Sequence, residues 1–459
     1  MAQTTGRNHA RAWERNKEDA CKEKRSHGKG IQRNVGMVRK TRRTNVRTQA
    51  VATQTWNLAV LTSVVAVATW KAVESYGRKV AERKKKRVVV VGSGFAGVRV
   101  ARRLQSDVTL LAKRDYFEFT PGVAHAMVDG THKQLTMKLE KAVPNANVEI
   151  IGNNDVVDVE DGYVHVQGKT FAYDYLVLAT GSTYTPPLKP SKIEERIHVR
   201  ERAFRICAEA LKDASNVLVI GGGVAGVELA ASFVSRYPQK KVYLADEHDR
   251  LLYKLPREAS IYAEKRLREK GVHLVLGERI KSRGMNGRTK GFECTTSGDT
   301  IEVETVFFCS GKKPNSEFGK LGPGETLLEW NEKGYIRVNE CLQSTRSGRI
   351  FVLGDVREKQ EREYIAGQAE READYVVKCI HRMLDGKEEL PPFRPGAVRL
   401  SVALGPSDGL MVNGDRLVAR GMIVPLVKQV IERWTIWFLA KRYFDFHRRM
   451  AVRLAPALA

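Results

Sequence analysis

The feature that most constrains the fold of this chain is a motif that occurs twice. Residues 87–104 read RVVVVGSGFAGVRVARRL, and residues 216–233 read NVLVIGGGVAGVELAASF. In both, an apolar run typical of a buried parallel strand is followed by glycines with the spacing G-x-G-x-x-G and then by a helical pattern. The chain therefore contains the same strand, glycine loop and helix in two places.

The glycines of such a loop have distinct tasks. The first permits a tight turn, the second lets the backbone approach a pyrophosphate, and the third lets the helix pack closely on the strand. The phosphates would lie at the helix N-terminus, where free N–H groups and the helix dipole favour negative charge. We therefore predict one dinucleotide at each loop. These are the first glycine loop, with Gly92, Gly94 and Gly97, and the second glycine loop, with Gly221, Gly223 and Gly226.

The two copies keep the same register over a longer distance. Each continues into short apolar runs broken by Gly and Asn, which in the first half (residues 147–173) indicate an antiparallel meander. Each half then closes with a buried strand and a glycine, Gly181 in the first and Gly311 in the second. From the first glycine of the loop to this closing glycine there are 89 residues in one half and 90 in the other. This regularity predicts an α/β fold with two Rossmann-like dinucleotide-binding domains, one for FAD and one for NAD(P)H.

The positive charge of the chain is concentrated at its two ends. The net charge is +25; residues 1–87 contain 22 Lys and Arg against 6 Asp and Glu, and residues 391–459 contain 11 against 4. A nucleic-acid-binding fold is expected to carry its basic face on the body of the domain, whereas basic ends beside apolar stretches suit an anionic membrane surface. We therefore expect contact with a membrane and no nucleic-acid partner.

The cysteines and histidines exclude several kinds of chemistry. The six cysteines lie at least 15 positions apart, and residues 98–206 contain none. A flavin disulfide reductase needs two close cysteines shortly after its first glycine loop, so this reaction is not expected. The ten histidines show no metal-ligand spacing, and the motif H-E-x-x-H is absent from the sequence. The sequence predicts no metal site.

Two apolar stretches adjoin the basic ends. Residues 48–70 run for 23 positions without a charge, about the span that a bilayer requires, and favour a membrane anchor. The alternative is a buried or peripheral helix. Residues 425–450 place aromatic and aliphatic side chains at helical spacing beside Lys and Arg, as in helices that lie in a bilayer interface. A helix packed on the protein body is the alternative there. We expect a membrane-associated protein, mitochondrial or on the cytoplasmic face of an intracellular membrane.

From residue 87 to about 440 the chain resembles the two-dinucleotide-domain flavoproteins. Within them it is similar to the type II NADH:quinone oxidoreductases and to the apoptosis-inducing-factor-like ferroptosis suppressor proteins. The order of the shared segments and the pair Gly354-Asp355 are more specific than the glycine loops alone. The shared segments are VVVVGSGFAG, YFEFTPG, YDYLVLATGS, VLVIGGGVAGVELA, SGKKPN, GYIRVNECLQ, IFVLGDV, YIAGQAEREA and ALGPSDG.

The resemblance implies which residues hold FAD. The first glycine loop would hold the pyrophosphate, with Thr180 and Gly181 near it. Asp355, after Gly354, would accept a hydrogen bond from a hydroxyl of the ribityl chain, a role that suits an anionic acceptor. The alternative is a turn carboxylate that caps a helix. One departure concerns the acidic residue expected about 20 positions after the first glycine, which is Ala112 here. Lys113 follows it and is a candidate cofactor-binding residue. Because the acidic residue is missing, FAD would be held more by its phosphates, or less tightly.

The resemblance also implies residues for the nicotinamide and the acceptor. Glu228 matches a glutamate near the nicotinamide; the alternative is a first-turn glutamate favoured by the helix dipole. Asp246 ends a strand, where a carboxylate binds the ribose 2′-hydroxyl and repels a 2′-phosphate. NADH is therefore favoured, with NADPH left open because Arg250 is near. Gln368 occupies the place of a quinone-contacting glutamine, and Glu372 replaces the second glutamine of that pattern. Polarity of a helix surface is the alternative for Gln368.

We predict a division into six segments. The FAD-binding domain is split by the inserted NAD(P)H-binding domain, and a small C-terminal α+β region follows. The segments are 1–47, basic and disordered; 48–70, the anchor; 87–205, the first part of the FAD-binding domain; 206–316, the NAD(P)H-binding domain; 317–390, the second part of the FAD-binding domain; and 391–459, the region in contact with a membrane.

The function predicted from these observations is that of an FAD-dependent NAD(P)H oxidoreductase. Hydride would pass from NADH to the flavin, and electrons would pass on to a lipid quinone. Two alternatives stay open: a soluble flavoprotein reductase for a small electron-carrier protein, and a redox-sensing signalling protein with slow turnover. A homodimer is also left open.

Overall fold

The computed structural model describes ten stretches of the chain: residues 62, 64–83, 85–151, 158–166, 168–286, 289–294, 297–318, 324–359, 364–387 and 389–440. The chain forms two compact units, residues 1–79 and residues 80–459. In the first unit, residues 64–79 are helical and exposed. The predicted disordered segment and residues 48–61 of the predicted anchor lie outside the described residues. Within the described stretches, no helix is both long and apolar enough to cross a membrane.

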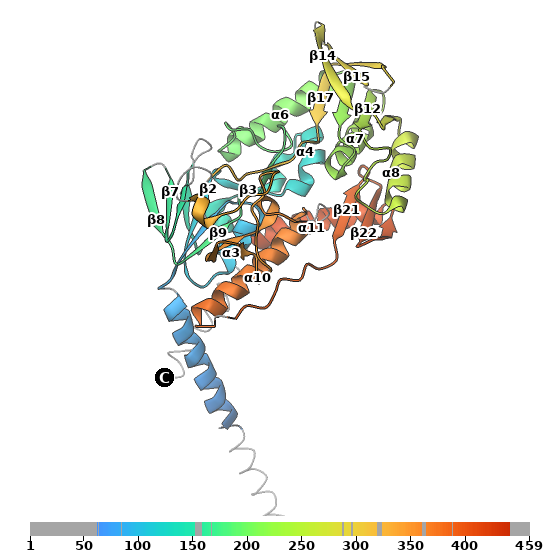
Figure 1. The fold of residues 1–459 in the computed structure, drawn as a ribbon. Helices are drawn as coiled ribbons and strands as arrows, with labels where there is room; N and C mark the ends of the chain where they lie inside the picture. Colours follow the sequence, from blue (N-terminus) through green and yellow to red (C-terminus); the bar gives the residue numbers. More distant parts are fainter. Residues whose placement is uncertain are drawn as a thin grey trace, which may run out of the picture. The chain divides into compact units, whose positions relative to one another are not determined.

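The second unit is built around two parallel sheets. The first has six strands, of which the edge strand β19 is antiparallel and the others are parallel. Helices α3 (Phe95–Arg103) and α10 (Ala366–Leu384) pack against each other beside it (Figure 1). In spatial order the strands are β19 (Gln343–Ser344), β20 (Ser347–Val352), β9 (Tyr175–Leu178), β1 (Arg87–Val91), β2 (Asp107–Ala112) and β5 (Asn147–Ile150).

The second sheet lies between the two parts of the first in the chain. Its four strands are all parallel, and two of the three connections between them are α7 (Val224–Arg236) and α8 (Arg257–Glu269). The strand order is β13 (Val272–Leu276), β12 (Lys241–Asp246), β11 (Asn216–Ile220) and β17 (Thr305–Phe308). Because β20 returns to the first sheet after β17, the second dinucleotide-binding domain is inserted into the first. The predicted α/β fold is confirmed. Helix α6 (Ile197–Asp213) leads from one sheet to the other.

Each half also contains a three-stranded antiparallel meander. In the first half it consists of β6 (Asp158–Glu160), β7 (Tyr163–Val166) and β8 (Lys169–Ala172). Residues 147–150 were expected in this meander, but they form β5, which pairs parallel with β2. That part of the prediction was wrong, because a four-residue run that alternates polar and apolar residues does not reveal its pairing partner. The meander of the second half consists of β14 (Ile280–Asn286), β15 (Thr289–Cys294) and β16 (Thr300–Val303).

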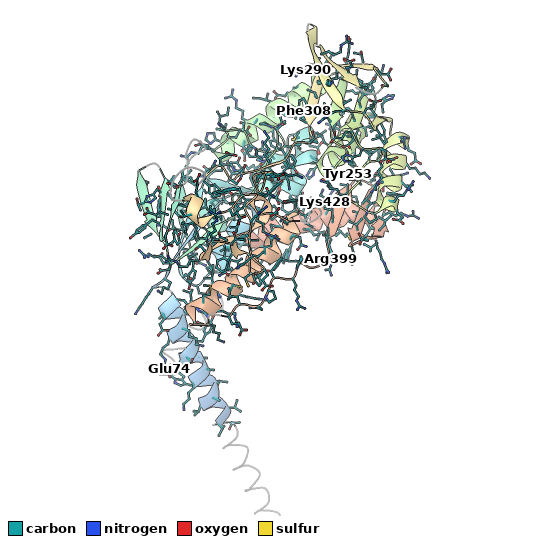
Figure 2. All side chains as sticks on the ribbon, viewed as in Figure 1. Glu74, Tyr253, Lys290, Phe308, Arg399 and Lys428 are labelled. Atoms are coloured by element: carbon teal, nitrogen blue, oxygen red, sulfur yellow. The ribbon has the colours of Figure 1, made fainter. Side chains whose placement is uncertain are left out.

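The C-terminal region is α+β, as predicted. An antiparallel sheet is formed by β21 (Arg399–Ala403), β22 (Gly409–Asn413) and β23 (Arg416–Arg420). Helix α11 (Ile423–Ala440) packs against this sheet, and it carries Lys428, which Figure 2 labels. Residues 441–450 of the predicted amphipathic helix lie outside the described residues.

Short elements join these parts. Two helices and a two-stranded sheet follow β2 and lie near α11. The short elements are β3 (Tyr116–Glu118), η1 (Thr120–Gly122), α4 (Val123–Asp129), η2 (His132–Leu135), β4 (Thr136–Lys138), α5 (Leu139–Ala142), β10 (Ser182–Thr183), β18 (Lys313–Pro314), α9 (Gly324–Leu327) and η3 (Gly354–Val356).

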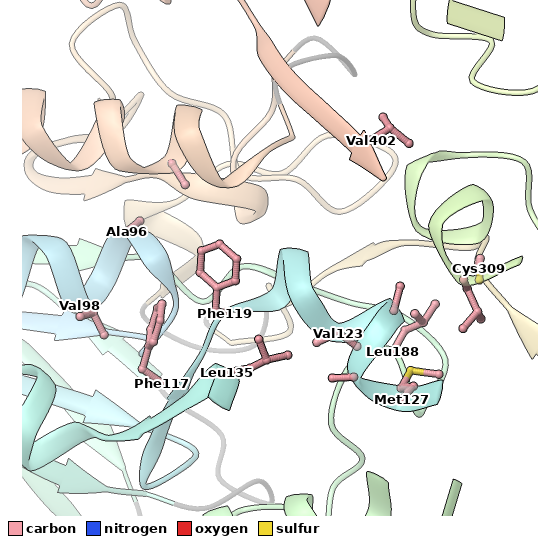
Figure 3. Close-up of a cluster of buried hydrophobic side chains, with 14 of the residues drawn as sticks. Ala96, Val98, Phe117, Phe119, Val123, Met127, Leu135, Leu188, Cys309 and Val402 are labelled. Carbon is pink, nitrogen blue, oxygen red and sulfur yellow. The ribbon is translucent and has the colours of Figure 1, made fainter. Parts of the chain in front are cut away.

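One hydrophobic core connects both dinucleotide-binding domains with the C-terminal sheet. Figure 3 shows part of it, in which Val123 and Met127 of α4 lie near Leu188, while Cys309 and Val402 belong to the second domain and to β21. All five side chains are buried. Burial of this kind is worth roughly 1.5–3 kcal/mol for each large aliphatic side chain.

Candidate active site

The geometry of the first glycine loop fits the three tasks of its glycines. Gly92 has φ +112°, which L-residues rarely adopt. A Cβ there would lie closer than 3.0 Å to the carbonyl oxygen of Ala179, the residue that follows β9. A Cβ on Gly97 would meet the carbonyl oxygen of Gly92 within the same distance. A Cβ on Gly94 would have no neighbour within 4 Å. The first and third glycines are therefore needed for packing, whereas Gly94 leaves open space for a ligand.

The second glycine loop repeats this geometry. Gly221 has φ +120°, and its Cβ would lie 2.9 Å from the carbonyl carbon of Cys309. A Cβ on Gly226 would be closer than 3.0 Å to the carbonyl oxygen of Gly221, and a Cβ on Gly223 would have no neighbour within 4 Å. The two loops thus offer the same kind of cradle.

The helices that begin at these loops have N-termini suited to phosphate. Gly94 is the N-cap of α3 and Gly223 that of α7; neither helix has a side-chain cap or an acidic residue in its first turn. The first N–H groups of a helix lack intrahelical acceptors, and the dipole favours an anion. Two dinucleotide pyrophosphates therefore fit the residues present.

Asp355 lies beside the first glycine loop. A Cβ on Gly354, the residue before it, would lie 3.8 Å from Cβ of Ala96, in the first turn of α3. The Oδ2 atom of Asp355 accepts a hydrogen bond from the hydroxyl of Ser182 at 2.9 Å. Burial would raise the pKa of Asp355, but nearby lysines and this hydroxyl hold it below its usual value. The carboxylate is therefore ionised and able to accept a hydroxyl hydrogen bond.

Three lysines surround Asp355, and the sequence did not single them out. Lys312 Nζ lies 3.9 Å from Oδ2 and Lys359 Nζ 4.0 Å from Oδ1, while Lys189 also acts on this carboxylate. Burial lowers the pKa of Lys312 to about 8, and Lys312 Nζ lies 3.0 Å from the ring centroid of Tyr364. One signal was available, because Lys312 directly follows Gly311, the closing glycine of the second half. Such positive surroundings suit a cofactor with anionic groups.

Hydrogen bonds join the segments that contain the two closing glycines, Gly181 and Gly311. Thr180 Oγ1 donates to the carbonyl oxygen of Asn315 at 2.7 Å, and Asn315 Nδ2 donates to the carbonyl oxygen of Thr180 at 2.9 Å. Gly181 and Gly311 both have positive φ, +72° and +77°. The ends of both parallel sheets therefore meet where the predicted FAD residues lie. Lys113 is exposed at the end of β2, after the fully buried Ala112.

Asp246 lies at the second glycine loop, as its position at the end of β12 predicts. It accepts a hydrogen bond from the backbone N–H of Gly222, and its Oδ1 accepts one from the N–H of His248 at 2.8 Å. His248 Nδ1 lies 2.6 Å from the same oxygen. Arg250 donates instead to the hydroxyl of Ser260 on α8, 2.6 Å away, so its guanidinium is engaged outside the glycine loop.

Glu228 joins three elements. It lies on α7, its side chain is buried, and its Oε1 accepts a hydrogen bond from the N–H of Ala403 on β21 at 2.9 Å. The same oxygen forms an ion pair with Lys428 on α11. The sequence did not identify Lys428 as a partner, because 200 positions separate the two residues. Glu228 therefore connects the second dinucleotide-binding domain to the C-terminal helix.

Gln368 and Glu372 are both buried, so neither belongs to a polar helix surface. Gln368 is 1% exposed and donates from Nε2 to the carbonyl oxygen of Gly396 at 2.9 Å. Glu372 accepts from the N–H of Gly354 at 2.6 Å and pairs with Arg357 at 2.8 Å. Glu372 thus holds the turn that presents Asp355.

Comparison with known proteins agrees with this geometry. A model of the pyridine nucleotide-disulphide oxidoreductase family matches residues 86–373. Ferroptosis suppressor protein 1 of Taeniopygia guttata is 30% identical over 342 residues, which cover 72% of this chain and 89% of that protein.

Solved structures share the fold. The sulfide:quinone oxidoreductase of the hyperthermophilic bacterium Aquifex aeolicus aligns with a TM-score of 0.63 at 18% identity, over 78% of this chain and 92% of that chain. NDH2 of Plasmodium falciparum in complex with NADH aligns with a TM-score of 0.61 at 14% identity, over 78% and 97%. The match to the family model and to the ferroptosis suppressor protein shows that the chain belongs to the pyridine nucleotide-disulphide oxidoreductase family and is an FAD-dependent NAD(P)H oxidoreductase.

Proposed function

We propose that the protein oxidises NADH and delivers the electrons to a lipid quinone at a membrane surface. The observation that carries the proposal is the position of α11. One side of this helix is buried on the protein body, where Lys428 pairs with Glu228 of the NAD(P)H-binding domain. The other side presents large apolar residues to solvent. A lipid substrate on the exposed side of α11 would therefore be separated by one helix from the NAD(P)H-binding domain on its buried side.

The exposed face of α11 is aliphatic and aromatic. Val430 is 65% exposed and Trp434 58%, and the Trp434 ring stacks on Phe438 at 5.3 Å. Helices with such a face and basic neighbours bind in the headgroup region of a bilayer. The other members of this exposed face are Ile423, Leu426, Ile431 and Trp437.

The roles of the protein's own residues follow from the contacts described above. The N-termini of α3 and α7 would bind the two pyrophosphates, and Asp355 would hold a ribityl hydroxyl. FAD, when bound, accepts hydride from the nicotinamide and releases electrons to the second substrate. The lysines around Asp355 would offset the negative charge of the cofactor, and the shared apolar core would exclude water. The five cysteines among the described residues are all free, which favours an external acceptor over an internal disulfide.

NADH is the proposed nucleotide because Asp246 lies against the second glycine loop. We expect Asp246→Asn to lower the ratio of kcat/KM for NADH to kcat/KM for NADPH by roughly tenfold. A hydrogen bond to a charged group is typically worth about 1.5 kcal/mol. The asparagine keeps an oxygen for the Gly222 N–H. The measurement is kcat/KM for NADH and NADPH, with the exposed Asp249→Ser as the control. Equal use of both nucleotides by the unaltered protein would contradict this assignment.

Membrane contact is tested on the exposed face of α11. Trp434→Glu should reduce flotation of the full-length protein with anionic vesicles by about tenfold, because it places a charge on the apolar face. Ile261→Glu is the matched control, since Ile261 is 59% exposed on α8, away from α11. Reduction of a quinone embedded in the vesicles should fall with flotation. If Trp434→Glu leaves both unchanged, α11 is not the membrane-contacting helix. If a small carrier protein is reduced and quinone is not, the soluble reductase replaces this proposal.

A further inference from the structure

A line of titratable side chains runs from solvent into the buried side of α11. His125 on α4 is 42% exposed, and its Nε2 lies 3.8 Å from Oε2 of Glu432. The Glu432 side chain is only 9% exposed. One helical turn earlier on the same helix is Lys428, which pairs with Glu228. Four ionisable groups from α4, α7 and α11 thus lie along one side of α11.

The local backbone makes room for the Glu432 carboxyl group. A Cβ on Gly122 would lie 2.8 Å from Glu432 Oε2 and would also crowd Leu135. Only a glycine at the end of η1 therefore lets this carboxyl group lie against the turn. Ile431 and Arg433 are the sequence neighbours of Glu432 on α11, and Ile431 belongs to the exposed apolar face. The carboxyl group lies between that face and the FAD-binding domain.

The surroundings of Glu432 and His125 shift their pKa values in opposite directions. Burial raises the pKa of Glu432, although Lys428 and Arg433 act in the opposite direction. Burial and Lys428 lower the pKa of His125, and Asp129 on its own helix opposes them. Glu432 therefore holds a proton more readily than an ordinary carboxylate, and His125 releases one more readily than an ordinary imidazole.

The proposed reaction requires a proton that NADH does not supply. NADH, one proton and a quinone give NAD+ and a quinol. The hydride from NADH accounts for both electrons and one proton, so a donor must bring the second proton to a quinone oxygen. In a site sheltered from water, a side chain that reaches solvent has to deliver it.

We propose that Glu432 donates this second proton to the quinone and that His125 returns a proton to Glu432 from solvent. Lys428 does not fill this role, because it is paired with Glu228. The 3.8 Å gap between His125 and Glu432 is of the kind that tightens when substrate binds. The proposal rests on the proposed quinone reductase function and adds two proton-transfer residues to it.

The test compares two electron acceptors in flavin-loaded, full-length protein. Ferricyanide takes electrons without protons, whereas a short-chain quinone requires both. We expect Glu432→Gln and His125→Gln to lower the ratio of quinone to ferricyanide turnover by about 10- to 100-fold at pH 7–8, within the range of general acid catalysis. The solvent deuterium isotope effect on quinone reduction should increase. The matched control is the exposed pair His165 and Glu160, 3.0 Å apart on the first meander, changed in the same way.

Two further readouts separate proton transfer from structure. Added imidazole should restore quinone turnover in His125→Ala, since this site reaches solvent, and Glu432→Asp should recover part of the loss. An NMR titration of the histidine rings should show a His125 resonance that shifts in Glu432→Gln. An unchanged acceptor ratio in both variants, with normal quinone turnover in the unaltered protein, would overturn this inference alone. If the unaltered protein reduces ferricyanide but no quinone, the proposed function and this inference both fall.

Discussion

Alanine at Gly94 and alanine at Gly97 are expected to damage the protein in different ways. Gly97→Ala should lower the free energy of unfolding by about 3 kcal/mol even without FAD, because its Cβ meets the backbone oxygen of Gly92, which cannot move away cheaply. Gly94→Ala should leave the stability of the flavin-free protein within about 0.5 kcal/mol, since its Cβ has no neighbour within 4 Å. Urea unfolding of the flavin-free protein measures both.

FAD affinity should separate the two variants further. In Gly94→Ala the new methyl group occupies the space where the pyrophosphate approaches, so we expect the dissociation constant for FAD to rise by about 100-fold, or ~2.7 kcal/mol. Gly223→Ala is the matched control on the second glycine loop and should keep FAD while NADH binding weakens. A Gly94→Ala protein that retains FAD like the unaltered protein would show that the first glycine loop does not hold the pyrophosphate.

Replacing Asp355 by alanine is expected to weaken FAD retention by ~1.5–3 kcal/mol, the range for a hydrogen bond to a charged group. The variant also removes the carboxylate that Lys312 and Lys359 approach within 3.9 and 4.0 Å, so the flavin-free protein should lose stability as well. Asp355→Asn keeps a hydrogen-bond acceptor, so its FAD affinity should lie between those of the unaltered protein and Asp355→Ala. Fluorescence titration with FAD measures the effect.

The control for Asp355 is Asp161→Ala, an exposed aspartate between β6 and β7 of the same domain. It should bind FAD like the unaltered protein. Equal FAD affinity in Asp355→Ala and Asp161→Ala would contradict the assignment of Asp355 to the ribityl chain.

The sequence was sufficient for features whose cause is local. The strand, glycine loop and helix are contiguous, so the spacing of the motif predicts that glycine is required at positions 92 and 97. The same holds for Asp246, because it directly follows the mainly apolar run of β12 in the sequence. The insertion of one domain into the other followed from the order of the motifs.

Features that depend on distant pairings could not be derived in this way. The ion pair of Glu228 with Lys428 joins residues 200 positions apart, and no pattern in either helix specifies it. The three lysines near Asp355 come from three separate segments. The edge strand β5 was misplaced because a short run of alternating polar and apolar residues is compatible with either sheet. Gln368 and Glu372 resemble polar surface residues in sequence, yet both are buried by contacts with Gly396 and Gly354.

The most direct test of the proposed electron path uses the flavin as its own indicator. Full-length protein loaded with FAD is mixed anaerobically with one equivalent of NADH and then with vesicles that contain a lipid quinone. The account predicts that NADH bleaches the flavin absorbance and that the quinone restores it within the turnover time. Restoration by a small electron-carrier protein but not by the quinone would contradict it.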